Sequence, residues 1–175
     1  REKWPVAGAR WIVLNPGARW TNKRWPAEYF AELVRSLSAE VSDVRFAVLG
    51  SEADEGLGRQ IVAAAPDRCL DLTGKTSLQE LIQWVRISEL MVTNDTGALH
   101  IAAALGRPVV ALFGPTNPPR TGPYGQFDRV MTHPLPCAPC MKDTCANVRP
   151  LECLRELSPR QVCARVRLSL VGSRE

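Results

Sequence analysis

The stretch from residue 93 to residue 116 constrains the fold more than any other part of the sequence. It reads as the end of an apolar strand, a sharp polar turn, a helix of small residues, and a second apolar strand over 109–113. A helix between two short apolar strands is typical of a unit whose strands run parallel. We therefore expect a parallel sheet that is covered by helices.

The same alternation continues along the chain. Apolar segments predict strands at 11–15, 44–49, 68–72, 90–93 and 109–113. Helical spacing and start signals predict helices at 26–37, 53–64, 76–86, 96–105 and from residue 158 onward. Elements that alternate in this way predict an α/β fold, a Rossmann-like parallel sheet with helices on both faces. From residue 114 to about residue 150 the alternation lapses into loops rich in proline and cysteine.

Composition narrows the class of protein. A length of 175 residues suits one domain, expected to span residues 1–175. The net charge of +4, from 22 basic and 18 acidic side chains, suits a small anionic ligand and falls short of a nucleic-acid binder, so we expect no nucleic-acid partner. The longest apolar stretch, 101–113, is interrupted at 106–108 and is too short to span a bilayer. No signal peptide is visible.

The polar turn of the opening stretch is the first candidate site. Asp95, Thr96 and Gly97 stand where a helix begins at the end of a strand. The first N–H groups of a helix are unpaired and carry partial positive charge, which suits a phosphate. Gly97 lets the backbone approach a ligand, and Thr96 can donate both its N–H and its hydroxyl. Ligands of open α/β sheets bind at such strand ends, so we expect a nucleotide or a nucleotide sugar.

Two side chains near this turn have more than one interpretation. Asp95 can cap the helix through its first N–H groups, or it can face away and meet a ligand hydroxyl. His100 lies one turn after Thr96 on the same side of the helix, where it can donate to a phosphate oxygen.

Loops after other strands add candidates at the same edge. Lys23 follows the first strand and is expected to place its charge on a diphosphate, whereas Arg24 is expected to be solvated. Thr116, after the fifth strand, is expected to complete the phosphate cradle with backbone N–H groups. Glu52 and Asp54 follow the second strand, where a carboxylate either binds ribose hydroxyls or is solvated.

The sequence offers no Asp-x-Asp metal motif and no general base beside a nucleophile. We therefore expect no required cofactor, and a leaving diphosphate would be stabilised by the helix start, Lys23 and backbone amides. No catalytic residue is assigned in this chain.

Six cysteines leave three alternatives open. Four of them, Cys137, Cys140, Cys145 and Cys153, are close enough in sequence to form a structural zinc site. A disulfide pair or reduced thiols that simply pack are the other two interpretations.

The order and spacing of several motifs resemble one family. These motifs are Asn15-Pro16-Gly17-Ala18, Lys23-Arg24-Trp25-Pro26, Asn94-Asp95-Thr96-Gly97 with His100, Phe113-Gly114-Pro115-Thr116, Gly122-Pro123-Tyr124-Gly125 and Cys153-Leu154. Between residues 11 and 166 the chain is similar to glycosyltransferase family 9, the ADP-heptose:lipopolysaccharide heptosyltransferases.

The resemblance implies a GT-B fold of two Rossmann-like domains, of which this chain matches the C-terminal, donor-binding one. By this resemblance Lys23, Asp95, Thr96, Gly97 and His100 would hold ADP-heptose, and Glu52 would match an acidic residue near the ribose. The resemblance also implies an inverting, metal-independent transfer of heptose to the lipopolysaccharide inner core, with the catalytic base in an N-terminal acceptor domain that this chain lacks. It further implies a cytoplasmic enzyme at the inner face of the bacterial inner membrane, with peripheral association of the full-length protein.

Two other functions remain open from the sequence. One is a GT-B transferase with another sugar or a UDP donor. The other is a non-catalytic interaction module in which the four cysteines fold around zinc.

Overall fold

The predicted strands form one parallel sheet in the order β3-β2-β1-β4-β5-β6 in the computed structural model, which describes residues 8–171. The strands are β1 (Arg10–Asn15), β2 (Val44–Val48), β3 (Cys69–Asp71), β4 (Leu90–Asn94), β5 (Val109–Phe113) and β6 (Val130–Thr132). The strand order reverses between β1 and β4. Ligands of open α/β sheets bind at such a reversal, outside the carboxyl ends of the strands.

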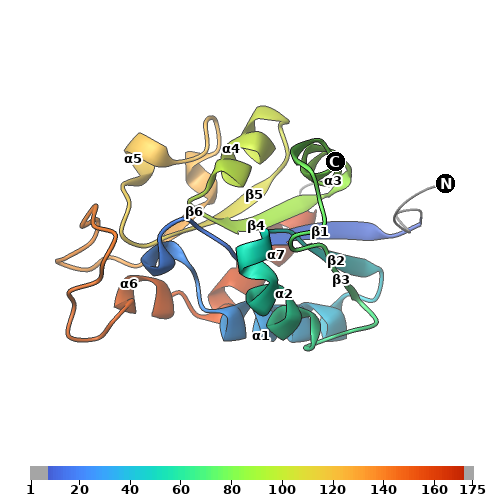
Figure 1. The fold of residues 1–175 in the computed structure, drawn as a ribbon, viewed down its shortest axis with the longest axis horizontal. Coiled ribbons are helices and arrows are strands. Elements are labelled where there is room, and N and C mark those ends of the chain that lie inside the picture. The colour runs from blue at the N-terminus through green and yellow to red at the C-terminus, as the bar shows by residue number, and fades with distance from the viewer. Residues whose placement is uncertain (1–7, 172–175) are drawn as a thin grey trace.

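Helices cover both faces of the sheet, as predicted (Figure 1). They are α1 (Ala27–Glu40), α2 (Glu55–Val62), α3 (Leu78–Ile87), α4 (Gly97–Ala104), α5 (Pro118–Thr121), α6 (Glu152–Arg155) and α7 (Pro159–Val171). One core cluster contains Phe30 and Leu33 of α1 with Val162 of α7. The other contains Trp84 of α3 and Leu99 of α4. Because strands buried on both faces need apolar side chains throughout, they read as continuous apolar runs.

Local signals place the helix starts close to where the sequence predicts them. Ser77 caps α3: its hydroxyl accepts from the Glu80 N–H at 3.3 Å, and the Glu80 carboxylate accepts from the Ser77 N–H at 2.8 Å. Pro26 stands one position before α1 rather than in its first turn. Three 3₁₀ turns, η1 (Thr21–Lys23), η2 (Glu52–Asp54) and η3 (Phe127–Arg129), lie in the connecting segments.

The segment from residue 114 to residue 150 is more ordered than the sequence predicts. It contains α5 and β6, and β6 extends the parallel sheet by pairing with residues 111–113 of β5. β6 was not predicted from the sequence because a strand of three residues is too short to show a period.

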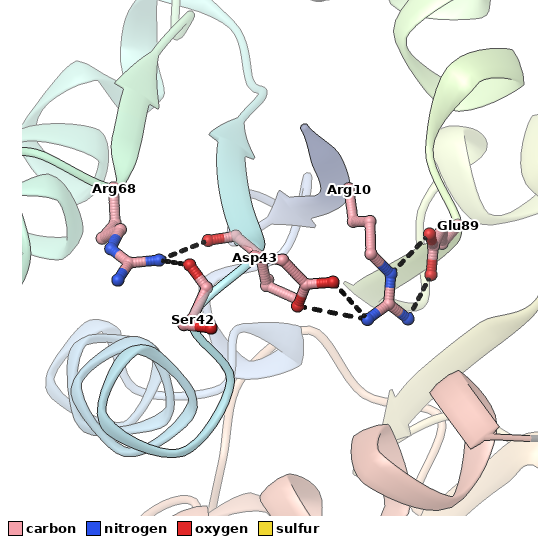
Figure 2. Close-up of polar contacts among 6 residues, drawn as sticks. Arg10, Ser42, Asp43, Arg68 and Glu89 are labelled. Carbon is pink, nitrogen blue, oxygen red and sulfur yellow. Dashed lines mark hydrogen bonds and ion pairs between the residues drawn. The ribbon is translucent and has the colours of Figure 1, made fainter. Parts of the chain in front are cut away.

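Arg10 ties together the amino ends of the three central strands, at the edge opposite the loops that follow them (Figure 2). Its guanidinium donates to both carboxylate oxygens of Glu89, just before β4, at 2.7 and 2.8 Å, and to Asp43, just before β2, at 3.1 Å. These two carboxylates raise the pKa of Arg10 above its ordinary value. Arg68, before β3, donates to the Ser42 carbonyl and so holds the next strand to the same end of the sheet.

Within residues 8–171 no helix is both long and apolar enough to cross a membrane.

Candidate functional site

A cavity of about 560 Å³ lies at the carboxyl edge of the sheet, over the reversal between β1 and β4. The segments that follow β1, β2 and β4, together with the start of α3, form its walls. Its lining includes Asn15, Gly17, Arg24, Gly50, Ser51, Asp54, Thr76, Ser77, Leu78, Leu81, Thr96 and Ala98. The cavity therefore lies at the strand ends where the sequence predicts a ligand.

Lys23 and Asp95, both predicted site residues, lie together beside this cavity. Lys23 Nζ is 2.9 Å from Asp95 Oδ2, and their side chains are 18% and 6% exposed. The ammonium also lies 4.7 Å from the centre of the Trp20 ring, within range of a cation–π contact. These two contacts hold the Lys23 side chain at the edge of the sheet where the sequence predicts a phosphate.

The structure corrects one interpretation of Asp95, because its carboxylate does not cap α4. It accepts instead from Lys23 and from the Thr121 hydroxyl, which is 3.3 Å from Oδ2. Thr96 is the residue at the capping position, and its side chain makes no capping hydrogen bond. The carboxylate therefore does not compete with a phosphate for the first N–H groups of the helix.

The start of α4 is open in the way that a bound anion requires. Gly97 is exposed, and a Cβ added there would meet no atom within 4 Å. His100, one turn further along, is exposed on the same helix. Thr96 lines the cavity, whereas Gly97 and His100 lie in the first turn of α4 outside its lining, and the ligand-binding role of all three stays a prediction.

The two carboxylates after β2 have different surroundings. Glu52 is exposed and is not among the residues that line the cavity. Asp54 is buried, lines the cavity, and accepts from the Ser51 N–H and hydroxyl at 2.9 and 2.7 Å. Arg24 lies 3.6 Å from Asp54 and donates to the Ala18 carbonyl, so it is bound within the site rather than solvated. The role of Glu52 near a ribose stays a prediction.

Thr116 lies deeper than its predicted role requires. The residue is 3% exposed, and its hydroxyl is buried without a hydrogen-bond partner among the described residues. The neighbouring Pro115 carbonyl accepts from the Met141 N–H at 2.7 Å, which holds the cysteine-rich segment against this loop.

All six cysteines are free thiols. Cys137, Cys140, Cys145 and Cys153 line one cavity of about 310 Å³. Burial is the main cause that raises the pKa of Cys153 to about 11, and the charges of the other three cysteines of this group raise it further. Over residues 8–171, no group of three or more Cys, His, Asp or Glu side chains is placed to hold a metal ion.

Two buried asparagines at the site were missed by the sequence analysis. Asn94 ends β4 and accepts from the Trp25 N–H at 2.9 Å, while its own amide donates to the Pro16 carbonyl at 2.8 Å. Asn15 ends β1 and donates to the Thr96 hydroxyl at 3.1 Å. Both belong to motifs quoted from the sequence, but their partners lie between 69 and 81 positions away, and only the strand order brings them together.

Fold and site together define a Rossmann-like α/β domain with a cavity and an open helix start at the strand reversal. Residues 2–149 match the family model described as glycosyltransferase family 9 (heptosyltransferase), and the chain belongs to that family.

Relatives and solved structures agree with this assignment. The chain is 42% identical over 124 residues to lipooligosaccharide heptosyltransferase 2 of Haemophilus influenzae, covering 67% of this chain and 35% of that protein. It is 32% identical over 179 residues to lipopolysaccharide heptosyltransferase 1 of Pseudomonas aeruginosa, covering 94% and 49%. The structure of the Escherichia coli ADP-heptose lipopolysaccharide heptosyltransferase II superposes with a TM-score of 0.82 at 29% identity, covering 97% of this chain and 49% of that one. The chain thus spans about half, or less, of the length of these proteins.

Proposed function

We propose that this chain is the donor-binding half of an inverting heptosyltransferase that transfers heptose from ADP-heptose to the lipopolysaccharide inner core. The observation that carries the proposal is the pairing of an uncapped, exposed start of α4 with the ammonium of Lys23 at the strand reversal. The Escherichia coli relative of similar structure is named for ADP-heptose, which supports this donor.

In this proposal the chain binds and orients the donor and stabilises the diphosphate as it leaves. Amide N–H groups at the start of α4 and the Lys23 ammonium face the charge that develops on the diphosphate oxygens. The base that activates the acceptor hydroxyl comes from a second domain. Because reaction rate depends on holding both reactants in line, we expect the chain alone to bind donor without transferring sugar.

A titration tests the donor assignment. In calorimetry the chain should bind ADP and ADP-heptose, and it should bind UDP at least about 10-fold more weakly. UDP binding as tight as ADP binding would instead support a GT-B transferase with another donor. Failure to bind any of these nucleotides would refute the proposal, and transfer of heptose by the chain alone would refute the assignment of the base to a second domain.

We further propose that transfer needs no metal ion at the reacting centre. In the proposed site, the helix start, backbone amides and Lys23 stabilise negative charge. Groups of these kinds can stabilise a diphosphate without a metal ion. ADP affinity should therefore be the same with excess EDTA as with added magnesium. A structural zinc at the four loop cysteines is a separate proposal that would require these thiols to move closer together, since within residues 8–171 they form no group placed to hold a metal ion. Metal analysis of the protein purified without chelator tests it.

We also propose that the enzyme acts at the cytoplasmic face of the inner membrane, to which it attaches peripherally. A lipopolysaccharide acceptor and a nucleotide-sugar donor would meet there. In a fractionated bacterial cell, the protein should be released from membranes by high salt. Recovery in the periplasm, or retention on membranes until detergent is added, would contradict this placement.

A further inference from the structure

Asn94 joins two parts of the proposed donor site that are far apart in the sequence. The β1–α1 loop, residues 16–26, carries Lys23. At the near end of this loop the Asn94 amide donates to the Pro16 carbonyl at 2.8 Å, and at the far end Asn94 Oδ1 accepts from the Trp25 N–H at 2.9 Å. The Asn94 side chain is fully buried. One amide therefore fixes both ends of the loop.

The neighbouring residue holds the centre of the same loop. Asp95 binds Lys23 at 2.9 Å and leads directly into α4. The end of β4 thus determines where the loop, its lysine and the start of the helix lie relative to one another. Asn15 makes the reciprocal connection, because it ends β1 and donates to the Thr96 hydroxyl at 3.1 Å.

We propose that Asn94 is a positioning residue for donor binding, whose amide sets the place of Lys23 relative to the start of α4. The inference rests on the proposed function, since it assumes that a diphosphate lies between these two groups. An amide is the neutral side chain that offers a donor and an acceptor in one plane, which is what the Pro16 carbonyl and the Trp25 N–H require. A buried polar group that loses such a partner is strongly disfavoured.

The Asn94→Asp variant separates positioning from simple packing. A carboxylate accepts from Trp25 but repels the Pro16 carbonyl, whereas a protonated carboxyl group can both accept and donate, as the amide does. Burial raises the pKa of such a carboxyl, so protonation is expected at mildly acid pH. Other charged or titratable groups belong to the same site: Lys23 and Asp95, which form an ion pair, and His100 on α4. The affinities are therefore compared with those of the unchanged protein at each pH.

The experiment measures ADP affinity of the chain and of three variants by calorimetry between pH 5 and pH 8. We expect Asn94→Asp to bind about 10-fold more weakly than the unchanged protein at pH 8 and within about 3-fold of it at pH 5. Asn94→Leu should stay weak at every pH. Val110→Ala, a cavity in the buried β5, should lower the melting temperature without changing affinity.

The ligand-free protein supplies an independent readout. Exchange of the Trp25 amide hydrogen should be faster in Asn94→Leu, and in Asn94→Asp at pH 8, than in Val110→Ala once global stability is taken into account. The role of Asn94 would be overturned if the ADP affinity of Asn94→Asp relative to the unchanged protein were the same at pH 5 and pH 8. It would also be overturned if exchange of the Trp25 amide hydrogen did not change. If the unchanged protein did not bind ADP, the proposed function would fail, and the exchange result would still decide whether Asn94 holds the loop.

Discussion

Lys23 Nζ lies 2.9 Å from Asp95 Oδ2, and both side chains are largely buried, so the ammonium of Lys23 is paired within the protein itself. In the proposed donor site, a diphosphate would have to share Lys23 with Asp95 or displace that carboxylate. The same carboxylate lies beside the start of α4, where it would repel an approaching phosphate. We therefore expect the pair to make anion binding weaker than it would be if Lys23 were unpaired.

Replacement of Asp95 by Asn should strengthen ADP binding. The change frees the ammonium and removes a repelling charge, and we expect an affinity gain of about 3- to 10-fold at low salt. If Asp95 also meets a sugar hydroxyl of the donor, which is one of the two roles expected from the sequence, ADP-heptose should gain less than ADP. Weaker binding of ADP by Asp95→Asn, measured by calorimetry, would show that the carboxylate does not oppose the diphosphate.

Loss of the Lys23 charge should act in the opposite direction. Lys23→Gln is expected to weaken ADP binding by about 10-fold, with a smaller effect at high salt, because the contact is electrostatic. Arg86→Gln is the matched control, since Arg86 is an exposed cation at the carboxyl end of α3 and does not line the cavity. Equal effects of the two variants would mean that only the overall charge of the protein matters.

Two glycines of the site should respond differently to a methyl group. Gly97→Ala is expected to fold normally, since the added Cβ meets nothing within 4 Å, but to lose ADP affinity because it occupies the approach to the helix start. Gly17→Ala places its Cβ 2.5 Å from Asp54 Oδ2 and should lower the melting temperature. Thermal melts with and without ADP measure both effects, and full ADP affinity in Gly97→Ala would place the phosphate elsewhere.

The buried thiols predict a loss of stability in alkali. Burial raises the pKa of Cys153 from 9.0 to about 11, so between these values the unfolded chain loses a proton that the folded protein keeps. Stability from this group is complete below pH 9 and falls as the pH rises toward 11. Cys153→Ala should therefore show a smaller drop in melting temperature from pH 8 to pH 10 than the unchanged protein. Cys137→Ala, which removes an exposed thiol and only a smaller cause of the raised Cys153 pKa, should change that drop less than Cys153→Ala does.

Local patterns were enough to predict the α/β fold and the edge that carries the site. The run of apolar residues in β1 and the capping pair Ser77 and Glu80 each depend on neighbours in sequence. The three-residue strand β6 has too few residues for such a pattern. What local patterns leave out is the order of strands in the sheet.

That order decides the side-chain partners within the site. Asp95 is well placed by sequence to cap α4, yet Lys23, 72 positions earlier, takes its carboxylate because β1 and β4 are neighbours. In the sequence, Asn94 looks like an ordinary polar residue of a turn. In the structure, the pairing of β1 with β4 brings residues 16 and 25 to its amide. Interactions between distant positions have no local signature, so they appear only in three dimensions.

The ion pairs of Arg10 with Glu89 and Asp43 have a consequence for redesign of the proposed donor specificity. Because the Arg10 ion pairs hold the amino ends of β1, β2 and β4 together at the far edge, we expect these strands to keep their register when residues 50–54 and 76–81 are varied, provided that Gly50, Asp54, Ser77 and Glu80 are kept. A combinatorial library restricted to these two segments would alter the wall of the cavity on an unaltered scaffold. Selection for binding of a different nucleoside diphosphate could then proceed with the anchoring lysine and helix left in place.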